Sequence, residues 1–343
     1  MNHKDNNVNQ PRIKELILEL SQLMSPNANP AVFEEIFTDV ALIGNEHNDI
    51  GDHKLLHKAL AELRKALKMF LPHRDKRKVA IFGSSRVSDS HPNYKLALEL
   101  AQGLTRQNYQ VITGAGRGIM EAANQGAGRE NSFGLNIKLP MEQSANSFIE
   151  NDPHLLEFKY FFTRKLVFVK ESSATVLLPG GFGTLDEGFE NLTLFQTGKC
   201  MPRPIILLDY QGDSYWDRWM DFISSMMVEQ GFVNKSDLSL VYRAHTAQQA
   251  IDQILGYYKV FHSLRYIGDL TVLRLTKTLP SDLIKELNTE FQDIIVKGTL
   301  RSTPPHNQEL KNKEYLELPR LSLHFDKVGY GRLNQLIAAI NQA

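Results

Sequence analysis

The sequence has a single cysteine, Cys200, and few other signs of covalent or metal stabilisation. One cysteine cannot form an intramolecular disulfide or a thiolate metal site, and its scarcity is typical of a reducing compartment. The histidines show no H-x-x-x-H or H-E-x-x-H pairing, so we predict no metal ion. The amino-terminal residues are polar, and no run approaches the roughly 18 apolar residues of a membrane span. We therefore expect a cytoplasmic protein without a membrane partner.

The chain also has no excess of positive or negative charge. The 343 residues include 39 Lys and Arg against 39 Asp and Glu, and the pI is about 7.2. Because the chain has no net positive charge, it has no overall electrostatic attraction for the phosphates of a nucleic acid, and we predict no nucleic-acid partner. Hydrophobic residues make up 42% of the chain, which is typical of folded soluble proteins, and the length predicts one to three domains.

Hydrophobic periodicity divides the chain into three parts. Helical patterns over 13–20, 30–43 and 56–70 predict an amino-terminal helical segment, residues 1–75, which ends near a basic stretch at 74–78 that is typical of a solvated linker. From 260 to 343 we predict a small accessory α+β module. Its expected elements are a strand at 270–275, a helix at 281–296, a strand at 321–325 and a helix at 332–340.

The middle part, residues 76–259, alternates short apolar runs with helical stretches. This alternation predicts an α/β domain with a Rossmann-like, mostly parallel sheet and helices on both faces. The predicted strands are 79–82, 109–112, 134–137, 174–178 and 204–208.

Three of these runs end in glycine-rich turns, at 83–86, 114–122 and 179–187. Ligands of open α/β sheets bind beyond the carboxyl ends of the strands, where glycine lets backbone amides face a phosphate. We therefore predict a nucleotide-class ligand at one sheet edge. The first turn lacks the G-x-G-x-x-G fingerprint, and no G-K-[ST] follows the glycines, so dehydrogenase and kinase chemistry are disfavoured. The first two turns give Gly83, Ser84, Gly114, Gly116 and Met120 as candidate binding residues.

Two further motifs leave alternatives open. Thr184-Leu-Asp-Glu187 fits a capping box, in which Glu187 folds back onto the start of its own helix, but Glu187 could equally be a carboxylate held beside the sugar of a bound nucleotide. Arg164-Lys165 usually indicates a solvated helix face, but beside an anion site the pair could contact a phosphate or leaving group.

The middle part resembles the Lonely Guy family of phosphoribohydrolases over residues 78–258. The resemblance rests on Gly114-Ala-Gly-Arg-Gly-Ile-Met-Glu-Ala, Arg164-Lys165 and Pro179-Gly-Gly-Phe-Gly-Thr-Leu-Asp-Glu187. It implies a homodimer or higher homo-oligomer that cleaves a nucleoside 5′-monophosphate, such as a cytokinin riboside monophosphate or an AMP-like nucleotide, to free base and ribose 5-phosphate, in either cytokinin activation or nucleotide salvage. It assigns catalysis to Arg164 and Glu187. Its implied substrate-binding residues are Glu142, Lys165, Gly180, Gly181, Phe182, Gly183, Thr184 and Asp186.

This chemistry requires neither a metal nor a redox cofactor, because an anionic group under C1′, a held water and a cation near the leaving side suffice. Gly188 and Asn191 depart from the apolar residues usual in short plant-type members. Two rivals remain: a lysine decarboxylase, which would need a pyridoxal phosphate lysine that no motif identifies, and a non-catalytic carrier or sensor of a nucleotide-like ligand.

Overall fold

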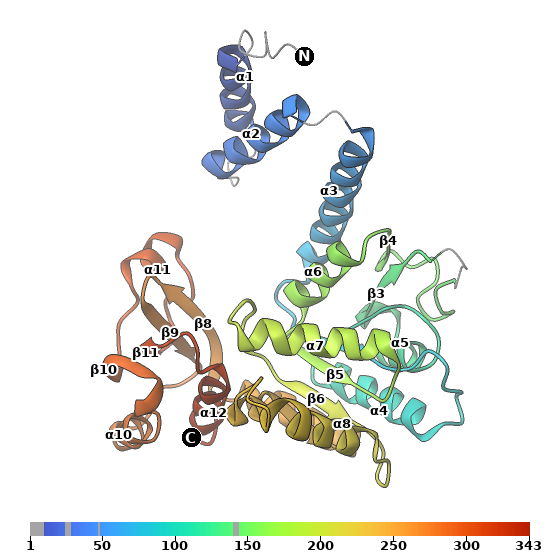
Figure 1. The fold of residues 1–343 in the computed structure, drawn as a ribbon, viewed down its shortest axis with the longest axis vertical. Helices are drawn as coiled ribbons and strands as arrows, with labels where there is room; N and C mark the ends of the chain where they lie inside the picture. The colour runs from blue at the N-terminus through green and yellow to red at the C-terminus, as the bar shows by residue number, and fades with distance from the viewer. Residues whose placement is uncertain (1–9, 25–28, 47–48, 140–143) are drawn as a thin grey trace. The chain divides into compact units, whose positions relative to one another are not determined.

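The computed structural model describes residues 10–24, 29–46, 49–139 and 144–343, and its chain divides into two compact units, 1–64 and 65–343. The first unit contains α1 (Gln10–Gln22), α2 (Pro30–Glu46) and most of α3 (Ile50–Phe70), which confirms the predicted helices (Figure 1). Within the described residues, no helix is both long enough and apolar enough to cross a membrane. The predicted three-part domain division stays a prediction.

The second unit is built on a seven-stranded sheet in which every pair of neighbours is parallel, so the predicted fold class is confirmed. The strand order is β4-β3-β2-β1-β5-β6-β7. The sequence did not reveal the two edge strands, β4 and β7, because only one residue of each is buried and neither has a continuous apolar run. The strands are β1 (Lys78–Phe82), β2 (Gln110–Thr113), β3 (Ser132–Ile137), β4 (Leu155–Phe158), β5 (Ala174–Leu177), β6 (Ile205–Leu208) and β7 (Val241–Ala244).

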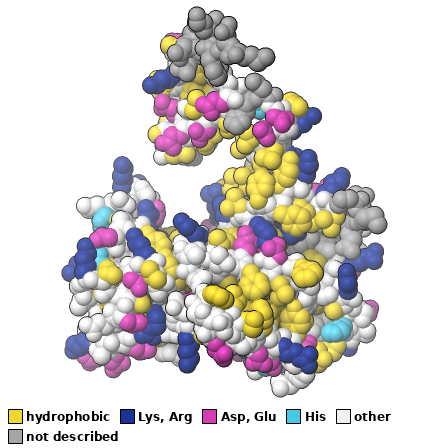
Figure 2. Space-filling view, in the orientation of Figure 1, with side chains coloured by type: hydrophobic (Ala, Val, Ile, Leu, Met, Phe, Trp, Pro, Cys, Tyr) yellow, Lys and Arg dark blue, Asp and Glu magenta, His cyan; other side chains and the backbone are white. Residues whose placement is uncertain are grey.

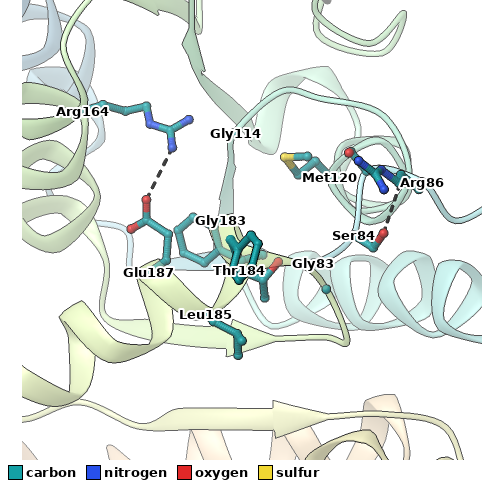
Figure 3. A pocket seen from close by; sticks show the side chains of 15 residues that line it. Gly83, Ser84, Arg86, Gly114, Met120, Arg164, Gly183, Thr184, Leu185 and Glu187 are labelled. Atoms are coloured by element: carbon teal, nitrogen blue, oxygen red, sulfur yellow. Dashed lines mark hydrogen bonds and ion pairs between the residues drawn. The ribbon is translucent and has the colours of Figure 1, made fainter. Parts of the chain in front are cut away.

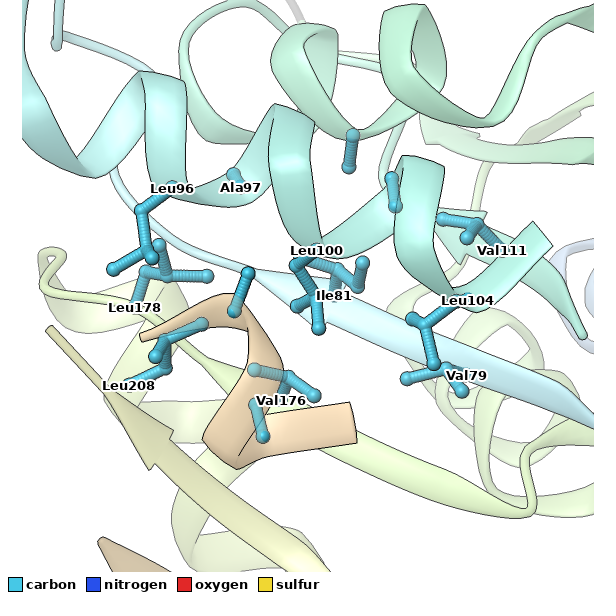
Figure 4. Close-up of a cluster of buried hydrophobic side chains, with 14 of the residues drawn as sticks. Val79, Ile81, Leu96, Ala97, Leu100, Leu104, Val111, Val176, Leu178 and Leu208 are labelled. Atoms are coloured by element: carbon cyan, nitrogen blue, oxygen red, sulfur yellow. The ribbon is translucent and has the colours of Figure 1, made fainter. Parts of the chain in front are cut away.

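Helices cover both faces of this sheet. Alternate residues of the central strands, including Val79, Ile81 and Val176, point to one face and pack with Leu100 and Leu104 of α4 in a fully buried core (Figure 4). The α4 side also holds α5 and α9, whereas α6 and α7 lie on the other face and α8 packs beside α7. Their bounds are α4 (Pro92–Arg106), α5 (Ile119–Ala127), α6 (Phe161–Glu171), α7 (Phe182–Gln196), α8 (Tyr215–Ile223) and α9 (Ala247–Tyr257).

The carboxyl-terminal part forms a second, antiparallel sheet with the order β10-β11-β9-β8. The expected β-α-β-α order was incomplete: β8 and β10 were missed, and the predicted helix 281–296 ends at Glu290, because Ile295 already begins β10. The strands are β8 (Phe261–Ile267), β9 (Leu270–Leu275), β10 (Ile295–Ser302) and β11 (Arg320–Phe325), and the helices are α10 (Ser281–Glu290), α11 (Asn307–Asn312) and α12 (Tyr330–Ile340).

Buried amides join this part to the main sheet. Asn341 Oδ1 accepts hydrogen bonds from the backbone N–H groups of Val260 and Phe261, both at 2.9 Å, and Asn334 Oδ1 accepts one from the Tyr257 hydroxyl at 3.0 Å. Because leaving buried polar groups unpaired is costly, these bonds hold the two sheets in one unit.

Candidate active site

The site lies where the strand order reverses. From β1 the chain adds β2, β3 and β4 on one side and then returns to place β5 on the other, so the connections after β1 and β5 leave in opposite directions. Such a switch point opens a crevice at the carboxyl ends of the strands. A cavity of about 710 Å³ occupies this position (Figure 3). The expectation that the three glycine-rich turns share one edge is confirmed, because all three contribute to its wall.

Close approach of backbone explains the glycines at this edge. A Cβ at Gly180 would lie 2.1 Å from Thr184 Oγ1, and one at Gly83 would lie 2.6 Å from Ile119 Cγ1. The Ser84 N–H donates to the Pro179 carbonyl at 3.1 Å, which ties the first turn to the third. The Tyr215 hydroxyl donates to the Gly180 carbonyl at 2.6 Å. The third turn is therefore held in place from both sides.

The start of α7 overturns the capping-box interpretation. The helix begins at Phe182 with Gly181 as its N-cap, and no side chain caps it within the described residues. Thr184 lies inside the first turn, where its N–H donates to the Gly181 carbonyl at 3.0 Å. A glycine N-cap with no side-chain oxygen leaves the first amides of α7 available to an anion, where the helix dipole favours negative charge.

Glu187 instead faces Arg164 across the cavity wall (Figure 3). Arg164 Nη2 lies 3.4 Å from Glu187 Oε1, and their side chains are only 13% and 2% exposed. Burial raises the pKa of Glu187, and the charges of Lys165 and Arg164 oppose this rise. Burial lowers the pKa of Arg164, against the opposing charge of Glu187. Glu187 Oε2 and Arg164 Nε are buried and make no hydrogen bond within the described part of the chain.

Lys165 sits among carboxylates instead of facing solvent. Its Nζ lies 2.8 Å from Glu190 Oε2, 3.0 Å from Asp186 Oδ2 and 3.6 Å from Glu187 Oε1. Burial alone would lower the pKa of Lys165, but the Glu190 hydrogen bond and the neighbouring negative charges raise it. The solvated-face alternative is therefore wrong for both Arg164 and Lys165.

Most of the predicted residues line this cavity, but not all. Gly116 does not line the cavity and lies against Met120. Lys165 and Asp186 belong to the charge cluster beside the cavity. Glu142 falls outside the described residues. Phe82, Ser85, Arg86 and Leu185 also line the cavity and were not predicted, although Arg86 follows Gly83 in the first turn. The predicted residues in its wall are Gly83, Ser84, Gly114, Met120, Arg164, Gly180, Gly181, Phe182, Gly183, Thr184 and Glu187.

Comparison with known proteins identifies relatives of this region. Residues 120–254 match the family model described as "Possible lysine decarboxylase". A probable cytokinin riboside 5′-monophosphate phosphoribohydrolase of Arabidopsis thaliana is 29% identical over 52% of this chain and 88% of its own. A second Arabidopsis cytokinin riboside 5′-monophosphate phosphoribohydrolase is 28% identical over 54% of this chain and 85% of its own. The middle region of the chain is therefore similar to the Lonely Guy phosphoribohydrolases.

Among solved structures, the molybdenum cofactor binding protein of Rippkaea orientalis is 20% identical and covers 52% of this chain and 95% of its own, with a TM-score of 0.39. The family match over residues 120–254 includes Arg164 and Glu187, and the matches to the two phosphoribohydrolases cover about half of the chain.

Proposed function

We propose that this protein hydrolyses the N-glycosidic bond of a nucleoside 5′-monophosphate to a free base and ribose 5-phosphate. The observation that carries the proposal is the buried Arg164–Glu187 pair beside an uncapped helix start in a switch-point cavity. The relatives named as phosphoribohydrolases support it.

The phosphate would bind at the turn Gly180–Thr184. The first amides of α7 and the helix dipole supply donors and favourable potential there. Arg86 and Ser84 line the same cavity on the β1 side and can add hydrogen bonds. Anchoring the phosphate orients the sugar over the catalytic pair, so binding energy remote from the reacting bond is used for positioning.

Glu187 would act on the sugar itself. Leaving of the base builds positive charge on the ribose ring, which a carboxylate beneath C1′ stabilises. Glu187 Oε2 has no partner within the described residues, so it can orient the attacking water and accept a proton from it. Arg164 would stabilise negative charge that develops on the departing base or balance that on the phosphate. Together the two residues supply opposite charges at the two ends of the breaking bond.

The position of Lys165 argues against decarboxylase chemistry. An imine requires a neutral amine, but three surrounding carboxylates raise the pKa of Lys165 and keep its amine protonated. We therefore do not assign it a Schiff-base role.

A panel assay tests the proposal. Purified protein is incubated with purine, modified-purine and pyrimidine 5′-monophosphates, and free base and ribose 5-phosphate are quantified by chromatography. We expect equal amounts of the two products from at least one substrate, and at least about a hundredfold less of both with the Glu187→Gln variant. Tight binding of a monophosphate without release of base would favour the carrier or sensor alternative.

A further inference from the structure

A second cavity lies at the amino ends of the parallel strands of the main sheet. Its volume is about 420 Å³, within the range of small-molecule sites, and the segments that precede β1, β5 and β6 form much of its wall. β8 closes another side through Phe261 and Leu264. The catalytic cavity lies beyond the carboxyl ends of β1, β2 and β5, so the two cavities lie at opposite ends of the parallel strands.

The wall of this cavity is positively charged. Arg77, Lys170, Lys199 and Arg203 line it, and no lining residue is acidic. Glu171 pairs with Lys170 at 2.5 Å and offsets part of that charge. Lys199 and Arg203 have no ion pair with any carboxylate of the described residues. Arg77 likewise has no carboxylate partner among the described residues, so three of the four cations in this wall are not paired with a carboxylate there.

Arg203 places a buried positive charge in the wall of this cavity. It is only 3% exposed, and its Nη1 donates to the carbonyls of Val169 and Ser172 at 2.7 and 2.9 Å. Its Nε and the Ser172 hydroxyl are both buried without a hydrogen-bond partner in the part of the chain that the structure describes. Arg203 Nη2 donates to Asn191 Oδ1 at 2.7 Å, so neutral protein groups accept most of its hydrogen bonds while its positive charge stays unpaired, and a buried unpaired charge is costly.

The contacts of Arg77 shape the rest of the cavity. Its guanidinium stacks on the Tyr258 ring, 3.6 Å from the ring centroid, and its Nη2 donates to the His262 carbonyl at 3.4 Å. The wall thus combines fixed guanidinium groups with an aromatic ring and apolar side chains, which suits a small molecule that carries both an anionic and an apolar part.

We propose that this second cavity binds a small phosphate-bearing molecule, with Lys170 and Lys199 contacting the phosphate and the buried Arg203 adding positive charge beside it. A phosphate, with its greater charge and several acceptor oxygens, suits a wall that carries several cations better than a single carboxylate does. The site is separate from the proposed catalytic one and does not depend on that function.

Cys200 provides a probe specific to this cavity. It lines the wall and is the only cysteine of the chain, so its modification by a neutral thiol reagent, followed by mass spectrometry, reports on this cavity alone. Burial raises the pKa of the Cys200 thiol, so the reaction is run near pH 8.5. The rate is measured with and without inorganic pyrophosphate, with sodium chloride at equal ionic strength as the reference.

We expect 10 mM pyrophosphate to slow the modification about tenfold if the dissociation constant is near 1 mM. The double variant Lys170→Gln/Lys199→Gln should lose this protection, because both side chains are exposed and their removal leaves the fold intact. Lys285→Gln, an exposed lysine on α10, and Glu187→Gln should keep it. Equal rates with pyrophosphate and sodium chloride, or full protection in the double variant, would overturn the proposal.

Equilibrium dialysis with radiolabelled orthophosphate covers the case in which the reagent does not reach Cys200. The wild type should bind one phosphate more per chain than the double variant. Equal numbers of sites would also overturn the proposal.

Discussion

Glu187 and Arg164 are buried charged side chains, and each has one polar atom without a hydrogen-bond partner among the described residues. Glu187 Oε2 and Arg164 Nε lack partners among the described residues, and the single contact between the pair is long at 3.4 Å. Such an arrangement contributes little to stability, because the desolvation cost of two charges approaches their attraction. The pair is better explained as preorganised charge for a ligand.

The first prediction at the residue scale concerns the charge of Glu187. Glu187→Gln keeps the shape of the side chain and removes its negative charge, so kcat should fall roughly a hundredfold or more while substrate affinity changes little. Steady-state kinetics and calorimetry measure the two effects. Glu229→Gln, an exposed residue distant in sequence from the cavity wall, serves as the matched control. A variant that keeps more than about a third of wild-type turnover would show that the catalytic assignment is wrong.

The second prediction concerns pH. Burial raises the pKa of Glu187 above its ordinary value of 4.5, so its carboxylate is lost at a higher pH than that of an exposed glutamate. Since the charged form is required, kcat/KM should fall as pH drops, with a midpoint above 4.5. Lys165→Met removes a cation that favours the charged form and should move this midpoint further upward. An unchanged or lower midpoint in that variant would contradict the electrostatic account.

At the scale of elements, a buried polar network joins α7 to the sheet. Asn191, one turn after Glu187, donates to the Glu187 carbonyl at 2.8 Å. Its Oδ1 accepts from Thr175 Oγ1 at 3.0 Å and from Arg203 Nη2 at 2.7 Å. This network explains why a polar residue stands at position 191.

The third prediction tests this network. Asn191→Leu leaves the Arg203 Nη2 and Thr175 Oγ1 donors unpaired, so the free energy of unfolding should drop by about 1–3 kcal/mol. Chemical denaturation of the full chain measures the change. The exposed substitution Asn312→Leu, on α11, should have a much smaller effect. Equal stability of Asn191→Leu and wild type would show that the network is not stabilising.

Particular elements show what the sequence could and could not predict. β1, β2 and β5 are buried along their whole length, so their apolar runs and terminal glycines predicted both the sheet and its ligand-binding edge. The half-exposed edge strands lacked that signal. The capping box failed because Gly181, and not Thr184, is the N-cap of α7. The second cavity was not predicted, because its wall is assembled from segments far apart in sequence.

At the scale of the whole molecule, exposed aromatic residues lie next to the site. Phe161 and Phe162 at the start of α6 are 50% and 54% exposed, and Phe182 at the start of α7 is 94% exposed. Figure 2 shows hydrophobic side chains gathered on the visible face of this unit, over the region where Figure 1 draws α6 and α7. Contiguous exposed apolar surface is typical of an interaction site. It supports the proposal, first made from the family resemblance, that the chain forms a homodimer or higher homo-oligomer.

The fourth prediction tests this assembly. Light scattering after size-exclusion chromatography should give at least twice the chain mass of 39.0 kDa for the wild type. Phe161→Glu/Phe162→Glu should reduce it to the mass of one chain, because burying two carboxylates in an apolar interface is costly. Val296→Glu, an equally exposed apolar residue on β10, should leave the assembly intact. A monomeric wild type would contradict this part of the account.

In the proposed reaction, the glycine-rich edge binds a 5′-phosphate and the Arg164–Glu187 pair then cleaves the glycosidic bond. The most direct measurement compares kcat/KM for a nucleoside 5′-monophosphate with that for the same nucleoside without phosphate, both followed by release of free base. Because the phosphate supplies the binding energy that orients the sugar, the account predicts a ratio of at least about a hundredfold in favour of the monophosphate. Equal rates on the two compounds, or no base from either, would contradict it.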